Sequence, residues 1–455
     1  MVYDLVVIGG GSAGYIAAKT AASYKKKICI VEKGPFGGLC ILRGCMPSKT
    51  LIYSARIFEL IKKAKDFGIH VDQNIKVDAK HIVERKNRII KGFADYRLSS
   101  IRKNKYIDLV MGKASFISKD KVQVGGKIIE GKNFLISTGS KILIPDIPGL
   151  KEAGYITSDD ALELKKFPRS LVILGGGPIT LELAYYFFNL GVEVAIIQRS
   201  SHVISGNDED LAEVIEESFR KKGIKIYTGT SLKKVSKIGA MKEVEFEQGN
   251  KSFKTKAEEI LVGLGRFPDF DGLNLDKTGM RLDDKGVPVL NEYLQTSLRN
   301  IYVAGDASRM MEVVNVAVEQ GRVVAENMFG KKEKIDYHKF PAAVFTHPEI
   351  AWIGLSEKEA KEKKLDVEIA KLNYEDLGKA VCLGETEGFI KMIMDKKSKR
   401  ILGVAIVGHL ASDIIHEAVP LLYNKNTIYD LAKMQHIHPT FGEIYSYLVE
   451  DCCNI

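Results

Sequence analysis

Residues 3–14 read YDLVVIGGGSAG, an almost wholly apolar run that leads straight into closely spaced glycines. Such a run is typical of a parallel strand buried on both faces, and the alanine-rich residues 15–23 suit a helix. The glycines therefore fall on a strand-to-helix turn with the spacing GxGxxG. There Gly9 permits the turn, Gly11 lets the backbone approach a pyrophosphate, and Gly14 lets helix and strand pack closely. We predict that these residues begin a dinucleotide-binding fold.

Acidic residues at two further strand ends extend this predicted site. An expected strand over residues 28–31 delivers Glu32, whose carboxylate can accept hydrogen bonds from ribose hydroxyls. Far along the chain, the apolar residues 301–304 end in Gly305 and Asp306, where a carboxylate can bind the ribityl hydroxyls of a flavin. We therefore expect a distant segment to complete the first domain. The other residues that we expect to contact FAD are Ser12, Lys33, Gly38, Thr138 and Gly139.

A second copy of the pattern lies in mid-chain, where residues 171–182 read LVILGGGPITLE. Gly175 and Gly177 are its expected nucleotide contacts, together with Gly265 near the end of the unit. Thr180 replaces the third glycine, and we expect this small side chain to loosen helix-strand packing without abolishing the site. Two such units in one chain imply two dinucleotides, one for electrons that enter and one for electrons that are held.

The strand that follows the second copy indicates which nicotinamide it binds. Residues 196–199 read IIQR, so Gln198 stands where an acid would hold the adenosine ribose, and Arg199 follows. Gln198 keeps the hydrogen-bonding capacity without the negative charge, and Arg199 offers a cation to a 2′-phosphate. This pattern favours NADP(H) over NAD(H).

Two cysteines follow the first glycine-rich turn. Cys40 and Cys45 lie in residues 37–49, which read GGLCILRGCMPSK. An isolated pair of intracellular cysteines is usually inert. Here glycines stand before and within the pair and Pro-Ser-Lys follows it, which favours a redox-active disulfide beside a flavin.

A histidine near the C-terminus supplies candidate acid-base chemistry. Residues 436–443 read HIHPTFGE, which places His438 five residues before Glu443. An imidazole is a base with a pKa near neutrality, and a carboxylate can fix its tautomer and stabilise its protonated form. His436 is interpreted as a packing or surface residue.

Vicinal cysteines, Cys452 and Cys453, stand in the tail. Two interpretations stay open for them: a mobile tail without function, or a soft-metal or thiol relay to the disulfide.

Composition narrows the class of protein further. A length of 455 residues suits about three domains, and the net charge of +9 comes from scattered lysines, which favours a solvated basic surface over nucleic-acid binding. No run of 18 apolar residues exists, so we expect no membrane span, and the first strand begins too early for a signal peptide. Six cysteines are too few for a disulfide scaffold, which favours a reducing cytoplasm.

Across essentially the whole chain, the order of these motifs resembles the class I pyridine nucleotide-disulfide oxidoreductases. We expect an α/β fold with two Rossmann-like domains and a C-terminal α+β dimerisation domain. The expected FAD domain covers residues 1–149 and 271–335, the NAD(P) domain residues 150–270, and the C-terminal domain residues 336–455. The resemblance also implies a homodimer.

The resemblance implies roles for individual residues. Cys40 would exchange with the substrate and Cys45 would lie against the flavin. Lys49 would pair with Glu182 near the flavin ring. In the homodimer, the two C-terminal residues His438 and Glu443 would act on the disulfide of the other subunit.

Within the family, residues 46–49 and 345–351 look most like dihydrolipoyl dehydrogenase, which implies a dithiol substrate such as a lipoyl group on a carrier protein. The alternative is an NADPH-dependent reductase of mercuric ion or of another disulfide, as indicated by Thr180, Gln198 and the vicinal cysteines. Mercuric reductases, however, generally carry tyrosine where this chain has His438. A non-catalytic flavoprotein, such as a redox sensor or a complex subunit, would be expected to have lost the disulfide or the histidine.

Overall fold

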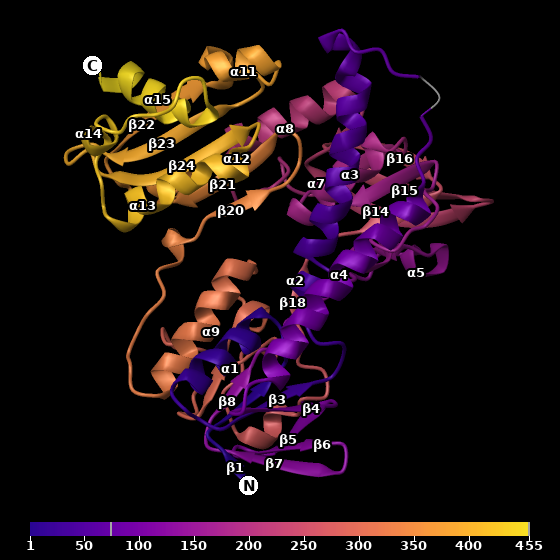
Figure 1. Ribbon diagram of the computed structural model, residues 1–455. Coiled ribbons are helices and arrows are strands. Elements are labelled where there is room, and N and C mark those ends of the chain that lie inside the picture. Colours follow the sequence, from indigo (N-terminus) through magenta and orange to yellow (C-terminus); the bar gives the residue numbers. More distant parts are fainter. Residues whose placement is uncertain (73–74, 454–455) are drawn as a thin grey trace. The chain divides into compact units, whose positions relative to one another are not determined.

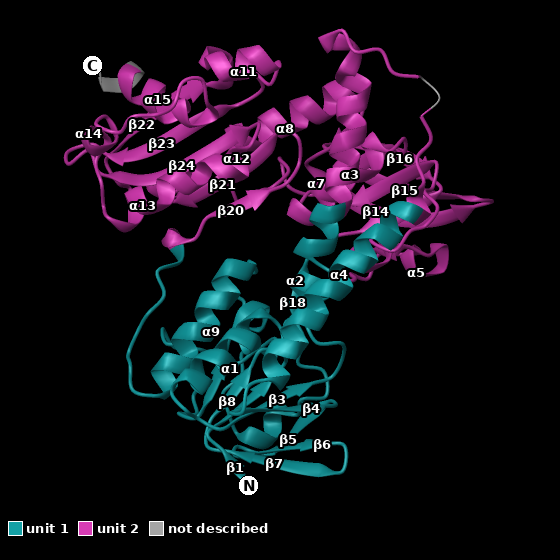
Figure 2. Ribbon diagram, viewed as in Figure 1, with its two compact units in different colours: residues 1–50, 81–143, 265–337 teal, residues 51–80, 144–264, 338–455 magenta. Residues whose placement is uncertain are grey.

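The computed structural model of the chain describes residues 1–72 and 75–453, apart from the side chains of residues 451–453. It divides into two compact units, each built from three stretches of chain (Figure 2). The first unit comprises residues 1–50, 81–143 and 265–337, and the second comprises residues 51–80, 144–264 and 338–455. The boundaries of the three expected domains remain predictions.

A parallel five-stranded sheet in the order β19-β8-β2-β3-β4 forms the centre of the first unit (Figure 1). Its strands are β2 (Leu5–Ile8), β3 (Ile28–Glu32), β4 (Ile107–Met111), β8 (Phe134–Ile136) and β19 (Ile301–Val303). Every residue of β2 and β3 is buried, as a strand covered on both faces requires. The last strand, β19, pairs with β8, so a distant segment completes this sheet.

Side chains of this sheet point alternately into two apolar layers. Leu5 and Val7 pack with helices α1 (Ser12–Ser23) and α9 (Val314–Met328), which lie side by side on one face (Figure 1). Val6 and Ile8 pack on the opposite face against a second sheet. That sheet has the order β1-β7-β6-β5, with strands β1 (Val2–Tyr3), β5 (Ala114–Ser118), β6 (Lys121–Val124) and β7 (Lys127–Gly131).

Amphipathic patterns in residues 51–67 and 79–103 predict two helices beside the flavin-binding part, and the structure has two long helices in this segment. The first, α3 (Cys45–Lys63), begins six residues before the expected start at Leu51, and a short 3-10 helix (Ala64–Phe67) follows it. The second is α4 (Ala79–Arg102). A short helix, α2 (Gly38–Leu42), precedes them, and β9 (Ser140–Ile142) pairs with β18 (Arg266–Pro268).

The second unit repeats the nucleotide-binding architecture. Its parallel sheet has the order β10-β17-β11-β12-β13, with strands β10 (Ile156–Thr157), β11 (Ser170–Leu174), β12 (Glu193–Ile197), β13 (Lys225–Tyr227) and β17 (Glu259–Val262). The helices of this part are α5 (Leu150–Ala153), α6 (Ser158–Ala161), α7 (Pro178–Asn189) and α8 (Glu209–Lys222). An antiparallel meander consists of β14 (Thr230–Ile238), β15 (Met241–Gln248) and β16 (Lys251–Ala257).

The C-terminal part of the second unit is an antiparallel sheet with helices. Its order is β20-β21-β24-β23-β22, with strands β20 (Ala342–Val344), β21 (Glu349–Gly354), β22 (Val367–Asn373), β23 (Phe389–Asp395) and β24 (Ile401–Gly408). The helices are α10 (Glu357–Glu362), α11 (Gly378–Leu383), α12 (Ala411–Ile414), α13 (Ala418–Tyr423), α14 (Ile428–Leu431) and α15 (Ile444–Cys453). Residues of β23, β24, α13 and α15 share one apolar core. The predicted fold class, two Rossmann-like parts and an α+β part, is confirmed.

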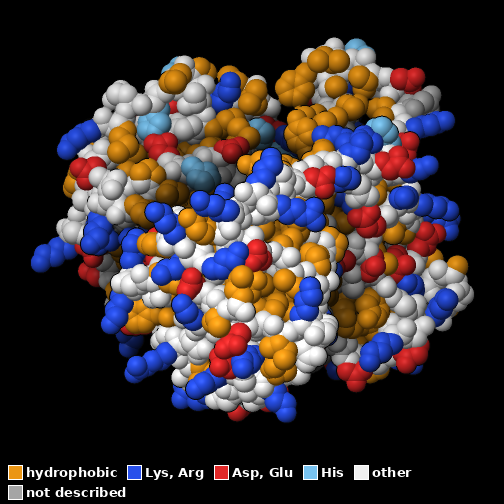
Figure 3. Space-filling model, turned by 60° about the horizontal axis from the view of Figure 1, so that its bottom comes forward, with side chains coloured by type: hydrophobic (Ala, Val, Ile, Leu, Met, Phe, Trp, Pro, Cys, Tyr) orange, Lys and Arg blue, Asp and Glu red, His pale blue; other side chains and the backbone are white. Residues whose placement is uncertain are grey.

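Lys and Arg side chains are distributed over the whole face drawn in Figure 3, with Asp and Glu side chains between them. Among the described residues, no helix has both the length and the apolar character needed to cross a bilayer.

Candidate active site and nucleotide-binding sites

The first glycine-rich turn leaves no room for side chains at its key positions. Gly9 has a φ of +104°, and a Cβ there would lie 2.3 Å from the carbonyl oxygen of Ser137. A Cβ at Gly14 would lie 2.0 Å from the carbonyl oxygen of Gly9, and one at Gly38 would lie 2.4 Å from Gly11 Cα. The backbone at the start of α1 is therefore bare, as the close approach of a pyrophosphate to a helix N-terminus requires.

Glu32 ends β3 and closes this turn. Its Oε2 accepts a hydrogen bond of 2.7 Å from the Gly10 N–H, and its Oε1 accepts one of 2.9 Å from the Gly34 N–H. Each carboxylate oxygen can accept a further hydrogen bond, so Glu32 can still accept hydrogen bonds from ribose hydroxyls. The neighbouring Lys33 forms an ion pair with Asp269.

Two polar side chains at the C-terminal ends of β8 and β19 fit a bound flavin nucleotide. The buried Oγ1 of Thr138 has no hydrogen-bond partner among the described residues, and such an atom calls for a partner that a ligand can supply. Asp306, just after β19, accepts a hydrogen bond of 2.7 Å from Ser140 Oγ, and Arg266 Nε donates to the same hydroxyl at 2.8 Å. Ser140 and Arg266 were not identified from the sequence, because no pattern marks a residue that orients a carboxylate.

The two cysteines lie on consecutive helices that are joined by a short connection, residues 43–44. Cys40 belongs to α2, and Cys45 is the first residue of α3. A Cβ at Gly44 would lie 3.0 Å from the Leu39 carbonyl oxygen and 3.2 Å from Cys40 Cα, so this glycine lets the two helices approach. Neither of the two cysteines is part of a disulfide in the structure.

The surroundings of the pair raise the pKa of Cys40 overall. A hydrogen bond with Cys45, followed by burial, raises the pKa of Cys40, while the cations Arg97 and Lys49 lower it. Sequence reasoning missed Arg97 of α4, which also donates a 3.4 Å hydrogen bond to Ser12 Oγ and covers the Tyr15 ring at 4.8 Å. Its position 57 residues from Cys40 gives no local signal.

The second glycine-rich turn in the second unit mirrors the first. Gly175 has a φ of +108°, and a Cβ there would lie 2.4 Å from the Gly263 carbonyl oxygen. Gln198 Oε1 accepts a 3.0 Å hydrogen bond from the Gly176 N–H, which is the bond that Glu32 makes to Gly10 in the first copy. Gln198 therefore holds the turn as the carboxylate would, without its charge. Arg199 is exposed and has no ion pair within the described part of the chain.

The second copy has threonine at the third fingerprint position on the helix, and it has a glycine at the end of the facing strand instead. A Cβ at Gly263, just after β17, would lie 2.1 Å from Thr180 Cγ2. In the first copy, glycine stands on the helix at Gly14 and a side chain faces it, because a Cβ there would lie 2.7 Å from Ser137 Oγ. The expected loosening by Thr180 stays a prediction; the methyl group of Thr180 occupies the space that Gly263 leaves free.

His438 and Glu443 form a hydrogen-bonded pair in the second unit. His438 Nδ1 lies 2.8 Å from Glu443 Oε1, and the imidazole is 71% exposed. Glu443 is buried, and its Oε2 accepts a 2.7 Å hydrogen bond from the Thr440 N–H. Burial raises the pKa of Glu443, but the Thr440 and His438 hydrogen bonds outweigh it and lower the pKa overall. The carboxylate is thus fixed on Nδ1, and Nε2 remains available at the surface.

The other sequence-predicted residues are placed as follows. His436 is half-buried, and its two ring nitrogens lie 2.6 Å from Ser446 Oγ and Glu417 Oε1, which fits its interpretation as a packing or surface residue. Glu182 of α7 is buried and accepts a 3.1 Å hydrogen bond from the Phe345 N–H. Lys49 belongs to the first unit and Glu182 to the second, so their pairing stays a prediction. The side chains of Cys452 and Cys453 lie outside the described residues.

Comparisons with known proteins agree with this arrangement. The model of the pyridine nucleotide-disulphide oxidoreductases matches residues 3–321, and the model of their dimerisation domain matches residues 340–448. A mercuric reductase of Staphylococcus aureus is 36% identical over 94% of this chain and 78% of its own length. A dihydrolipoyl dehydrogenase of Chlamydia pneumoniae is 34% identical over 98% of this chain and 95% of its own.

Among solved structures, a Cu(II) complex of the HOCl-induced flavoprotein disulfide reductase RclA from Escherichia coli superposes with a TM-score of 0.88. Its sequence is 26% identical, and the match covers 99% of each chain.

Proposed function

Because the chain belongs to the pyridine nucleotide-disulphide oxidoreductase family, with FAD and a pyridine nucleotide as cofactors, we propose that it oxidises a small dithiol through Cys40 and Cys45. The dithiol that we propose is a dihydrolipoyl group, free or on a carrier protein. The observation that carries this proposal is the exposed imidazole of His438 fixed on Glu443. Oxidation of a dithiol releases protons and needs a base, whereas binding of a soft metal ion needs thiolates and no such base.

The proposed chemistry on the chain's own residues is two thiol-disulfide exchanges. His438 Nε2 takes the proton of one substrate thiol, and the resulting thiolate attacks Cys40 Sγ in the Cys40–Cys45 disulfide. The disulfide breaks, and Cys45 leaves as a thiolate. The second substrate thiol then attacks the substrate sulfur that is bound to Cys40, and its proton passes to the departing Cys40 sulfur, which releases the oxidised substrate and the Cys40 thiol.

The residues around these sulfurs have supporting roles in the proposal. Glu443 holds a proton on His438 Nδ1, so that Nε2 is the basic nitrogen, and it stabilises the imidazolium. Lys49 and Arg97 favour the thiolate form of the pair. Bound FAD would supply the route by which the electron pair of the reduced cysteines reaches the nicotinamide.

We assign FAD to the first turn and the strand ends around it. The bare backbone at Gly9 and Gly11 would face the pyrophosphate, Glu32 the ribose, and Asp306 the ribityl chain. The unpaired Thr138 Oγ1 supports a ligand at this place. The further residues that we propose for this site are Ser12, Gly14, Lys33, Gly38, Gly139 and Gly305.

We assign the nicotinamide dinucleotide to Gly175, Gly177 and Gly265 and propose that it is NADP(H). Gln198 makes the hydrogen bond in the second turn that Glu32 makes in the first, but it is uncharged and does not repel a 2′-phosphate. The exposed Arg199 can form an ion pair with that phosphate.

Replacement of Arg199 with alanine should weaken NADP(H) binding by roughly ten- to a hundredfold and leave NAD(H) binding nearly unchanged. One charge-assisted contact to phosphate is worth about 1.5 to 3 kcal/mol, which is lost only for the phosphorylated dinucleotide. Fluorescence titration of both dinucleotides into the variant measures this. Gln198→Glu is the matched variant, in which the restored carboxylate should shift the preference towards NAD(H). A higher kcat/KM with NAD(H) in the wild type would overturn the assignment.

The dimerisation domain supports a homodimer, and the active species should therefore have twice the mass of the 50.5 kDa chain. Light scattering coupled to gel filtration at assay concentration measures this mass. An active monomer would remove the proposed cross-subunit role of His438.

The substrate is tested by assaying purified enzyme with dihydrolipoamide, oxidised glutathione and mercuric ion, each with both nicotinamides. The proposal requires the highest kcat/KM with dihydrolipoamide. A higher value with mercuric ion would favour the second candidate function, mercuric-ion reduction, which the 36% identity to a mercuric reductase supports.

A further inference from the structure

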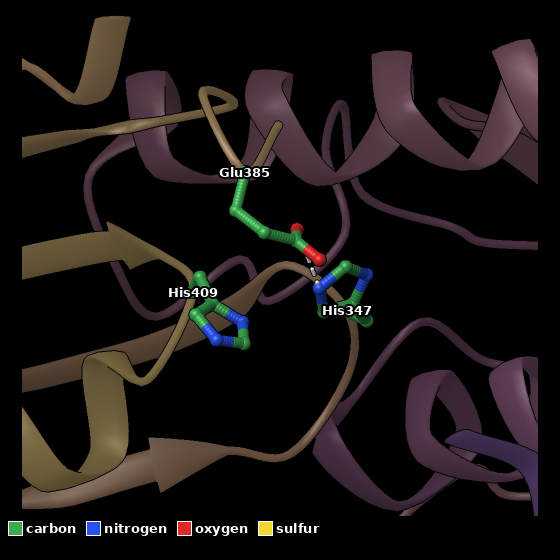
Figure 4. A group of neighbouring side chains, drawn as sticks. All are labelled: His347, Glu385 and His409. Carbon is green, nitrogen blue, oxygen red and sulfur yellow. Dashed lines mark ion pairs between the residues drawn. The ribbon is translucent and has the colours of Figure 1, made fainter. Parts of the chain in front are cut away.

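Two histidines and a glutamate converge in the second unit at a place that the proposed chemistry does not use. They are His347, Glu385 and His409, and one ligand atom from each lies within 4.8 Å of the others (Figure 4). His347 is buried, whereas Glu385 and His409 are half-buried, so the cluster can be reached from solvent.

Strand register explains why residues so far apart in sequence meet here. Glu349 of β21 pairs with Gly408 of β24, which sets His347 beside His409. Phe389 of β23 pairs with Val407, so the loop that carries Glu385 reaches the same end of the sheet. The three side chains come from three separate loops and point towards one another (Figure 4).

The imidazole of His347 is left without a good hydrogen bond. It is only 6% exposed, yet neither ring nitrogen has a hydrogen-bond partner within the described residues. Nε2 lies 3.0 Å from Glu385 Oε2, close enough for an ion pair but without the alignment of a hydrogen bond. The ring nitrogens of this buried imidazole are therefore open to a ligand from outside the chain.

A second layer of residues already orients the possible ligands. The other nitrogen of His347, Nδ1, lies 3.5 Å from Glu59 Oε2. Arg56 donates to Glu59 Oε2 and to Glu385 Oε1, both at 2.8 Å, which leaves Glu385 Oε2 directed at the histidines. In metal sites, a ligating histidine usually has a carboxylate or carbonyl at its second nitrogen, which fixes the tautomer.

Two cations balance the two carboxylates of this layer. Lys222 Nζ lies 3.2 Å from Glu59 Oε1, and Arg56 contacts both acids. With neutral imidazoles, these four charges sum to zero. The competing arrangement is therefore a closed ion-pair network in which a protonated His347 bridges Glu59 and Glu385 without any metal.

We propose that His347, Glu385 and His409 bind Zn²⁺, with a water molecule as the fourth ligand. Two imidazole nitrogens and one carboxylate oxygen are a ligand set that zinc accepts in a tetrahedral site. The ion would join the loops before β21, before β23 and after β24, and so stabilise the dimerisation domain. The proposed role of the ion is to hold these loops together, independently of the Cys40–Cys45 chemistry.

Zinc binding is measured on the FAD-loaded enzyme without a polyhistidine tag. The enzyme is oxidised, its remaining thiols are alkylated and it is stripped with a chelator, so that cysteines cannot bind the added metal. Competition with a chromophoric chelator should give one Zn²⁺ per chain, and Zn²⁺ should raise Tm because it binds only the folded state. No binding to the wild type would establish the metal-free network instead.

Three variants locate the ion. His409→Ala and Glu385→Gln should each weaken Zn²⁺ binding by more than about tenfold and remove the Zn²⁺-dependent rise in Tm. His416→Ala, which removes an exposed imidazole of the same domain, should bind Zn²⁺ as the wild type does. Bound FAD and the zinc-free Tm report whether each variant is folded. If His409→Ala and His416→Ala bind Zn²⁺ equally, the ion lies elsewhere and the proposal is wrong.

Discussion

Replacement of Cys45 with serine should abolish dithiol-linked turnover, by roughly 10³-fold or more, while FAD stays bound. Without the Cys45 sulfur, no disulfide exists for the substrate thiolate to break, and the residues that act together in such a step cannot replace one another. The proposed FAD contacts are backbone at Gly9 and Gly11 and the carboxylates of Glu32 and Asp306, so loss of a thiol leaves them intact.

Anaerobic turnover of dihydrolipoamide and the ratio of flavin to protein absorbance measure these two effects separately. Cys382→Ser is the matched control, because this cysteine is exposed and belongs to α11, outside the proposed site. Wild-type rates in the Cys45 variant would refute the exchange mechanism. Loss of FAD together with activity would refute the assignment of the cofactor contacts.

Replacement of His438 with glutamine should lower kcat for dihydrolipoamide by roughly 10²- to 10⁴-fold, the usual contribution of a positioned acid-base group. The loss should shrink as the pH rises past about 8.5, because the substrate thiol then ionises without a base. His436→Gln is the contrast. Its two ring nitrogens contact Ser446 and Glu417, so we expect lower stability and an unchanged pH profile of activity.

Hybrid dimers test whether His438 acts across the interface. In a dimer of one Cys45→Ser chain and one His438→Gln chain, a cross-subunit arrangement leaves one complete site, whereas a within-subunit arrangement leaves none. An equal mixture of exchanging chains should therefore recover about a quarter of the wild-type activity. Recovery no higher than that of the separate variants would place the histidine and the disulfide in the same chain.

The nucleotide-binding parts could be predicted from sequence because their signals are local. The run before Gly9 and the spacing to Gly14 are read within twelve residues, and they correspond to a buried strand followed by a helix. The same holds for His438 and Glu443, which lie on one short turn.

Other parts of the site depend on contacts between distant segments and gave no such signal. Arg97 reaches Ser12 from a helix 85 residues away. His347, Glu385 and His409 meet only through the register of three antiparallel strands, which the sequence does not specify. Helix α3 begins at Cys45, six residues before Leu51, so the segment that carries the second cysteine is also helical. The prediction is based on the amphipathic pattern of residues 51–67, which does not include that segment.

The pairing of Thr180 with Gly263 has a consequence for how such chains are recognised. The third glycine of a dinucleotide fingerprint leaves space where the helix meets the end of the facing strand. That space holds one side chain, so glycine is needed on the helix or on the strand end, but not on both. The first copy has this glycine on the helix and the second on the strand end. A sequence motif that requires glycine at the helix position will therefore not detect chains in which the glycine lies on the strand end. The two positions should vary as a pair, so that a substitution harmful at one becomes tolerable once the other has changed.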